Sequence, residues 1–88
     1  MITVEYTRRF LHDFAKLPPE LQEEVLEKVK LFKNPRNHQR LRVHKLHGDL
    51  LGKMSFSISY RLRIIFEYIG KQRKIAALIT VGDHSIYD

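Results

Sequence analysis

The chain has no cysteine, no tryptophan, and only four glycines and three prolines among its 88 residues. Without cysteine, neither a disulfide framework nor a cysteine-ligated zinc ion can stabilise the fold, and the chain suits a reducing compartment. No apolar stretch approaches the roughly 18 residues that cross a membrane, and the first ten residues lack the apolar run of a signal peptide. We therefore expect a cytoplasmic protein that does not engage a membrane.

The short motifs of the common enzyme classes are absent as well. The sequence contains no Gly-rich phosphate loop, no HExxH zinc motif and no GxSxG nucleophile motif. His44 and His47 could in principle share a metal ion, but residues at this spacing point to opposite faces of an extended strand, and further ligands are lacking. We expect neither a metal ion nor another cofactor.

The excess of positive over negative charge lies in the second part of the chain. Residues 1–33 hold six Lys/Arg and six Asp/Glu, whereas residues 34–88 hold ten and four, so this segment carries the whole formal charge of +6. Segregated charge of this kind creates a potential that attracts polyanions. Nucleic acid is the expected partner, and an acidic protein is the alternative.

The hydrophobic pattern of the first part predicts a strand followed by two helices. ITVEYT alternates as a strand does, and Thr7 is a plausible helix N-cap. Pro18-Pro19 separates the two helices, and Asn34-Pro35 ends the second one. The two helices should therefore form a hairpin. The apolar stripes expected to be buried are Phe10, Leu11, Phe14 and Leu17 in the first helix and Leu21, Val25, Leu26, Val29 and Phe32 in the second.

The second part predicts a mostly antiparallel sheet. From Met54 to Tyr68 every even position is apolar or aromatic, which indicates two strands joined by a turn near Ser59–Arg61. The run KIAALITVG reads as a strand buried on both faces. A short extended piece is expected near 41–46. Residues 1–88 should thus form one α+β domain in which the helices cover the even-numbered face, leaving Lys53, Arg61 and Arg63 on the open face.

The element order and three segments, KLHGDLLG at 45–52, RIIF at 63–66 and VGDHSIY at 81–87, resemble the RelE/ParE toxin superfamily, in particular the RelE-like and YoeB- or YafQ-like messenger-RNA endonucleases. The resemblance covers nearly the whole chain. It implies a toxin of a type II toxin–antitoxin system that cuts messenger RNA in the ribosomal A site. A cognate antitoxin encoded beside it would neutralise the toxin.

The resemblance also implies site residues. The family arginine that lies three positions before an aromatic residue corresponds to Arg63, with Arg61 as the alternative register. The family position at the entry to the second strand of the toxin sheet falls on either His44 or Lys45. The acidic base of some branches has no counterpart, so the base stays open. The candidate catalytic residues are Arg63, His44, Lys45, His84 and Tyr87.

These residue types suit RNA cleavage by the neighbouring 2′-hydroxyl. That reaction needs a base, cations that stabilise the charge gathering on phosphorus, and an acid for the leaving 5′-oxygen, and histidine can serve as base or acid near neutrality. Arg63 would bind the phosphate, and Tyr87 or Tyr60 could stack on a base. The expected RNA contacts are Arg36, Arg40, Arg42, His47, Lys53 and Arg61.

Two other functions remain open at this point. The chain could be a ParE-like toxin that poisons DNA gyrase by binding it, or an RNA-binding module without catalytic activity. A gyrase poison would not need His84, Tyr87 and the arginines on one face, which favours the ribonuclease.

Overall fold

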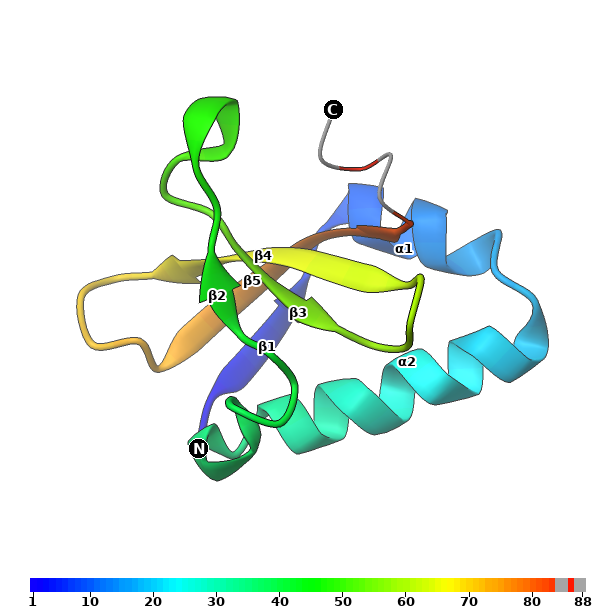
Figure 1. The fold of residues 1–88 in the computed structure, drawn as a ribbon, viewed down its shortest axis with the longest axis horizontal. Coiled ribbons are helices and arrows are strands. Elements are labelled where there is room, and N and C mark those ends of the chain that lie inside the picture. The colour runs from blue at the N-terminus through cyan, green and yellow to red at the C-terminus, as the bar shows by residue number, and fades with distance from the viewer. Residues whose placement is uncertain (84–85, 87–88) are drawn as a thin grey trace.

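The structure, a computed structural model, describes residues 1–83 and 86. Five strands form one sheet in the order β1-β5-β4-β3-β2, flanked by two helices (Figure 1). In chain order the elements are β1 (Thr3–Tyr6), α1 (Arg8–Ala15), α2 (Pro19–Phe32), a 3-10 turn (Pro35–Asn37), β2 (His44–Lys45), a second 3-10 turn (Gly48–Leu50), β3 (Met54–Ser57), β4 (Arg63–Ile69) and β5 (Ile75–Gly82). Only the β1–β5 pair is parallel. The predicted α+β class with a mostly antiparallel sheet is confirmed.

The helix boundaries follow the local signals in the sequence. The Thr7 hydroxyl accepts a hydrogen bond from the Phe10 backbone N–H at 3.1 Å, as an N-cap does. The same hydroxyl donates to the carbonyl of Leu78 at 2.7 Å, so the start of α1 is tied to β5. Pro19 opens α2, because the fixed φ of proline suits the first helical turn and its missing N–H would have no partner there.

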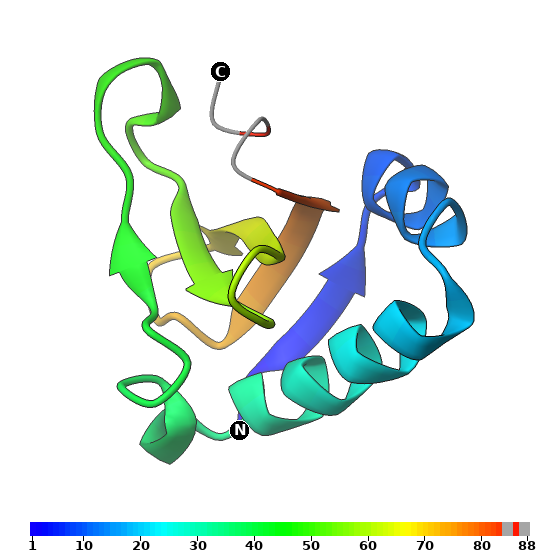
Figure 2. The same ribbon diagram turned by 45° about the vertical axis from the view of Figure 1, so that its right-hand side comes forward.

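The helices differ in what they cover. α2 packs its buried residues Val25, Val29 and Phe32 onto the sheet. α1 instead contacts β5, and Figure 2 shows it nearly end-on while α2 is seen along its length. The expected stripes were too wide: Leu11 and Leu26 are 51% and 52% exposed, because neither helix has a neighbouring layer on its outer side.

An aromatic cluster forms the centre of the core. The Phe32 ring stacks on Phe56 with centroids 4.4 Å apart and meets Phe66 edge-on at 4.8 Å. His38 stacks on Phe32 at 4.8 Å, and its Nε2 donates to the Phe32 carbonyl at 2.8 Å. The core thus joins α2, β3 and β4 through side chains from even positions of the sheet, as the alternation predicted.

A β-bulge near the end of β5 changes its alternation. Phe66 pairs with Leu78, but the preceding Ile65 pairs with Thr80, so Ile79 is the extra residue. Val81 therefore returns to the core face and Thr80 turns to the other face. The expectation that β5 is buried on both faces throughout was wrong: Ile75, Ala77 and Ile79 are partly exposed, because no second helical layer lies over them.

The turn between β3 and β4 lies where the sequence placed it, with Tyr60 91% exposed at its tip. Within residues 1–83 and 86, no helix is both long enough and apolar enough to traverse a lipid bilayer.

Replacing Phe32 by alanine should lower the free energy of unfolding by about 3–5 kcal/mol, because it leaves a cavity between α2 and the sheet. The matched change Leu26→Ala, at a half-exposed position of the same helix, should cost no more than about 0.5 kcal/mol. Urea unfolding followed by circular dichroism measures both. Equal losses at the two positions would contradict the packing described for α2.

Candidate functional site

The face of the sheet that is turned away from the aromatic core, called the open face above, is defined by strand register, although Ser55, Ile65 and Thr80 on it are buried. His44 pairs with Ser55, Ser55 with Ile65, and Ile65 with Thr80, which makes one row across four strands. Partners in adjacent strands point to the same side of a sheet, so this row faces away from the aromatic core. The next row along β4 consists of Ser57, Arg63 and Gly82.

Arg63 occupies the middle of that second row. Its guanidinium donates to the Ser57 hydroxyl at 2.8 Å. Its Nε is buried and, within the described part of the chain, has no hydrogen-bond partner. The carboxylate of Glu67, on the same strand as Arg63, lies 4.0 Å from the Lys53 ammonium. Among the described residues Arg63 is therefore held by a neutral hydroxyl rather than a carboxylate, so its charge is available to an anion.

His44 lies on the same face at the edge strand. Its Nδ1 is 2.8 Å from the Arg42 carbonyl, and because a carbonyl only accepts, Nδ1 carries the proton. In the neutral ring the Nε2 atom is then the acceptor. Arg42 has a φ of 57°, a left-handed conformation unusual for a side-chain-bearing residue, at the turn before β2. Strand spacing places the backbones of His44 and Arg63 on the order of 10 Å apart.

Lys45 lies on the other side of the strand from His44. It pairs with Met54, whose side chain belongs to the core face, and Lys45 itself is exposed at the sheet edge. Of the two residues that the sequence left open at this position, the register places His44, and not Lys45, on the face of Arg63.

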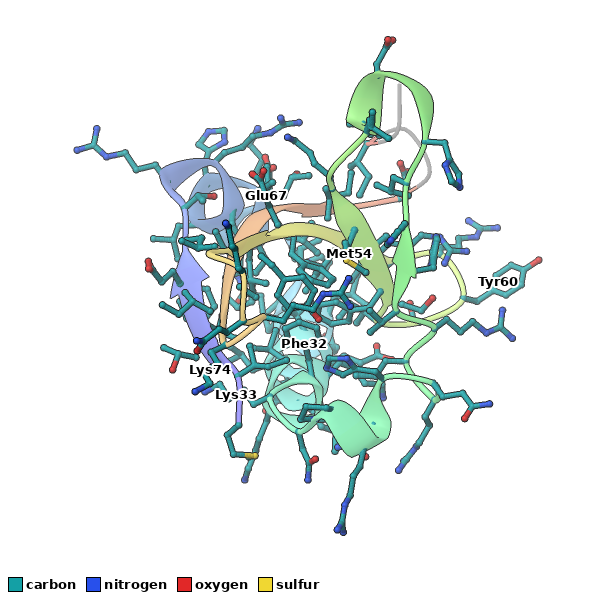
Figure 3. The ribbon with its side chains drawn as sticks, turned by 90° about the vertical axis from the view of Figure 1, so that its left-hand side faces the viewer. Phe32, Lys33, Met54, Tyr60, Glu67 and Lys74 are labelled. Atoms are coloured by element: carbon teal, nitrogen blue, oxygen red, sulfur yellow. The ribbon has the colours of Figure 1, made fainter. Side chains whose placement is uncertain are left out.

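The expected RNA-contacting residues do not all lie on this face. Lys53 lies on it, four residues before Ser57 along the same segment. Arg61 is exposed in the turn beside Tyr60 rather than in the strand, and Figure 3 shows Tyr60 projecting from the body of the protein. The remaining four, Arg36, Arg40, Arg42 and His47, are exposed in the segments that flank β2. The structure thus brings His44, Lys53 and Arg63 to one face, and the register does not place the other expected contacts on it.

A groove of about 860 Å³ opens beside the open face, between α1, the Tyr60 turn and the end of β5. In it, the Thr80 hydroxyl donates to the Asp13 carboxylate, which also lies 3.8 Å from the Arg9 Nε. This contact ties α1 to the strand that leads to the C-terminal segment. Sequence reasoning missed it, because nothing local relates position 13 to position 80.

The missing side chain of Gly82 leaves space that the Ile86 side chain occupies. A Cβ atom at Gly82 would lie only 2.5 Å from the Cγ2 atom of Ile86. Ile86 donates its backbone N–H to the Asp83 carbonyl at 3.1 Å. Because Gly82 is the strand partner of Arg63, Ile86 lies close to the arginine row. His84 and Tyr87, both expected in the site, lie outside the described residues.

Of the residues that the structure describes, no three or more histidines or carboxylates gather closely enough to hold a metal ion. The chemistry that the described site offers is therefore that of a fixed cation, a histidine with an accepting nitrogen, and an exposed aromatic ring.

Comparison with known proteins shows which solved structures have a similar fold. No family model and no curated protein matches the sequence. Among solved structures, the RelBE2 toxin–antitoxin complex from Mycobacterium tuberculosis superposes with a TM-score of 0.75 at 21% identity over 94% of this chain and 98% of that one. A chain of the RelE–RelB complex from Pyrococcus horikoshii gives 0.71 at 16% identity, covering 93% of each chain. YafQ from Escherichia coli gives 0.69 at 12% identity, with 99% and 98% covered. The protein thus has the fold of these toxins, as the sequence resemblance implied.

Replacing Gly82 by alanine should push Ile86 off the sheet, because the added methyl group needs its space. We expect Gly82→Ala to cost about 1–2 kcal/mol more with Ile86 present than in an Ile86→Ala background, as overpacking does. A double-mutant cycle by urea unfolding measures the difference. The same cost in both backgrounds would show that Ile86 does not rest on Gly82 in solution.

Proposed function

We propose that this protein is the toxin of a type II toxin–antitoxin system, an endoribonuclease that cuts messenger RNA in the ribosomal A site by attack of the neighbouring 2′-hydroxyl. The observation that carries the proposal is Arg63: a cation held by Ser57, with a buried and unpartnered Nε among the described residues, on the open face of a sheet whose fold is that of RelE and YafQ.

Arg63 suits the electrostatic part of this reaction. In the proposed step the 2′-oxygen forms a bond to phosphorus while the bond from phosphorus to the 5′-oxygen breaks. Negative charge gathers on the non-bridging oxygens, where a guanidinium fixed in advance stabilises the transition state. The products are a 2′,3′-cyclic phosphate and a 5′-hydroxyl, so water is not the nucleophile in the strand break.

The proton transfers are assigned to histidines. We propose His44 as the base, because its Nε2 is the accepting nitrogen and its side chain shares the face of Arg63. Lys45, on the other side of the strand, is the weaker candidate. His84 is proposed as the acid that protonates the leaving oxygen, and Tyr87 and Tyr60 as rings on which a splayed base stacks. In this proposal the site binds messenger RNA on the ribosome, where the bases of the message are already unstacked and the strand is fixed in place.

The partners follow from charge and fold. We propose that RNA phosphates are contacted by Lys53 and by the exposed residues Arg36, Arg40, Arg42, His47 and Arg61. The RelBE2 and RelE–RelB structures are toxin–antitoxin complexes, which supports a cognate antitoxin for this protein. Such a pair would act in the cytoplasm, where ribosomes are found.

The proposal predicts that Arg63 is essential for cleavage. Arg63→Ala should lower the rate of message cleavage on the order of a hundredfold or more, the scale of one lost charge-stabilising donor. Arg61→Ala removes the same charge two residues away and should cost less than about tenfold, because Arg61 lies exposed in the turn. Primer extension of a message in a purified translation system measures both rates.

A gyrase supercoiling assay with the parent protein is the control for function. Inhibition of gyrase without message cleavage would identify a ParE-like poison, and RNA binding without either activity would identify a silent binding module. Parent-level cleavage by a folded Arg63→Ala variant would remove Arg63 from the mechanism.

A further inference from the structure

The segment that leads into β2 ends in a turn of the Schellman type, the turn that commonly closes a helix. The Val43 N–H donates to the His38 carbonyl at 3.0 Å, and the Arg42 N–H donates to the Gln39 carbonyl at 3.1 Å. Arg42 itself takes the left-handed conformation, with a φ of 57°. This bond pattern around a left-handed residue defines the motif, in which that residue is usually glycine. We call residues 38–43 the Arg42 turn.

The hydrophobic core holds the Arg42 turn in place. His38 stacks on Phe32 with the ring centroids 4.8 Å apart, and its Nε2 donates to the Phe32 carbonyl at 2.8 Å. Leu41 is only 3% exposed, and Val43 packs against the core cluster. Because side chains at both ends of the turn are anchored, its backbone has a defined position relative to the sheet.

The Arg42 turn interrupts the ladder between β2 and β3. The ladder contains a hydrogen bond from Leu46 to Lys53, and in an antiparallel pair such bonded positions recur at every second residue. Regular continuation would give the Ser57 N–H to the Arg42 carbonyl. It donates instead to the Leu41 carbonyl at 2.8 Å, so that two residues oppose one, as in a β-bulge. Ser57 therefore does not take up the Arg42 carbonyl.

The carbonyl that Ser57 does not use accepts from the His44 ring. The Nδ1 atom of His44 lies 2.8 Å from the Arg42 oxygen. Histidine free in water favours the tautomer with its proton on Nε2, whereas this contact requires the proton on Nδ1. The bond thus selects the less common tautomer and also limits the rotation of the ring.

Ser57 links the Arg42 turn to Arg63. Its main-chain N–H donates to the Leu41 carbonyl at 2.8 Å, and its hydroxyl accepts from the Arg63 guanidinium, also at 2.8 Å. Since both bonds end on one residue, the turn that orients His44 and the cation of the site are fixed to the same point of β3.

We propose that the Arg42 turn positions His44 for proton transfer, and that Arg42 is a positioning residue that acts through its main-chain carbonyl rather than through its charge. The left-handed conformation takes the carbonyl out of the ladder, the carbonyl holds the proton on Nδ1, and Nε2 is left as the acceptor. The use of this arrangement in cleavage rests on the proposed function, whereas the orientation of the ring does not depend on it.

Two variants separate the backbone of Arg42 from its charge. Arg42→Gly and Arg42→Val both remove the guanidinium. Glycine adopts a positive φ without penalty, whereas a β-branched side chain is strained there. The Arg42 turn should therefore persist in the glycine variant and be lost or distorted in the valine variant. Arg42→Ala, with a smaller side chain, replaces Arg42→Val if circular dichroism melting shows that the valine variant is unfolded.

The first measurement is the tautomer of His44, read from two-bond ¹H–¹⁵N spectra of protein labelled at its histidines. The spectra are taken at about pH 8.5, where an ordinary histidine is neutral, and His44→Gln identifies the signals. We expect the parent protein and Arg42→Gly to carry the proton on Nδ1. In Arg42→Val the ratio of the Nδ1–H to the Nε2–H form should fall about fivefold, the scale of one neutral hydrogen bond.

The second measurement is message cleavage in a purified translation system. Arg42→Val should cut about fivefold more slowly than Arg42→Gly, because a smaller fraction of the protein holds the competent tautomer. The difference should appear in kcat rather than in KM, since both variants have lost the same charge.

The outcomes distinguish the positioning role from the proposed function. A proton on Nε2 of His44 in the parent protein, or equal tautomer ratios in the two variants, would overturn the role of the turn. Equal cleavage by two variants that differ in tautomer would overturn its use in the reaction. If the parent protein cuts no message while the tautomer still follows the turn, the turn orients His44 and the proposed function fails.

Discussion

The stacking of Phe32 on Phe56 and Phe66 is the contact on which the two-sidedness of this protein depends. It fixes α2 against the even-numbered positions of β3 and β4, so the odd-numbered positions must face the other way. Arg63 stands between the buried residues Leu62 and Ile64 and is aimed by that packing at the open face. The hydrogen bond that the guanidinium donates to the Ser57 hydroxyl then fixes it within that face.

Much of this arrangement could be predicted from local sequence. Pro18-Pro19 marks the break between the helices, Thr7 caps the first of them, and strict alternation from Met54 to Tyr68 places Arg63 opposite the core. These signals are local, because capping, proline geometry and strand alternation each depend on a few neighbouring residues.

What could not be predicted depends on contacts between distant residues. The bulge at Ile79, the bond from Thr80 to Asp13 and the space that Gly82 leaves for Ile86 involve pairings that no local pattern reveals. The choice between His44 and Lys45 likewise depended on which of them pairs with Ser55. Leu11 and Leu26 were misplaced because periodicity shows that a side chain could be buried, not whether another layer covers it.

The proposed reaction makes one claim that separates it from hydrolysis by activated water: the nucleophile is the 2′-hydroxyl of the message. The chemical nature of the ends at the cut site tests this claim most directly, by end-specific ligation of fragments from a purified translation system. Attack by the 2′-hydroxyl predicts upstream fragments that carry a 2′,3′-cyclic phosphate or a 3′-phosphate, and downstream fragments with a 5′-hydroxyl. Upstream fragments ending in a 3′-hydroxyl, with a 5′-phosphate downstream, would contradict it and indicate metal-activated water.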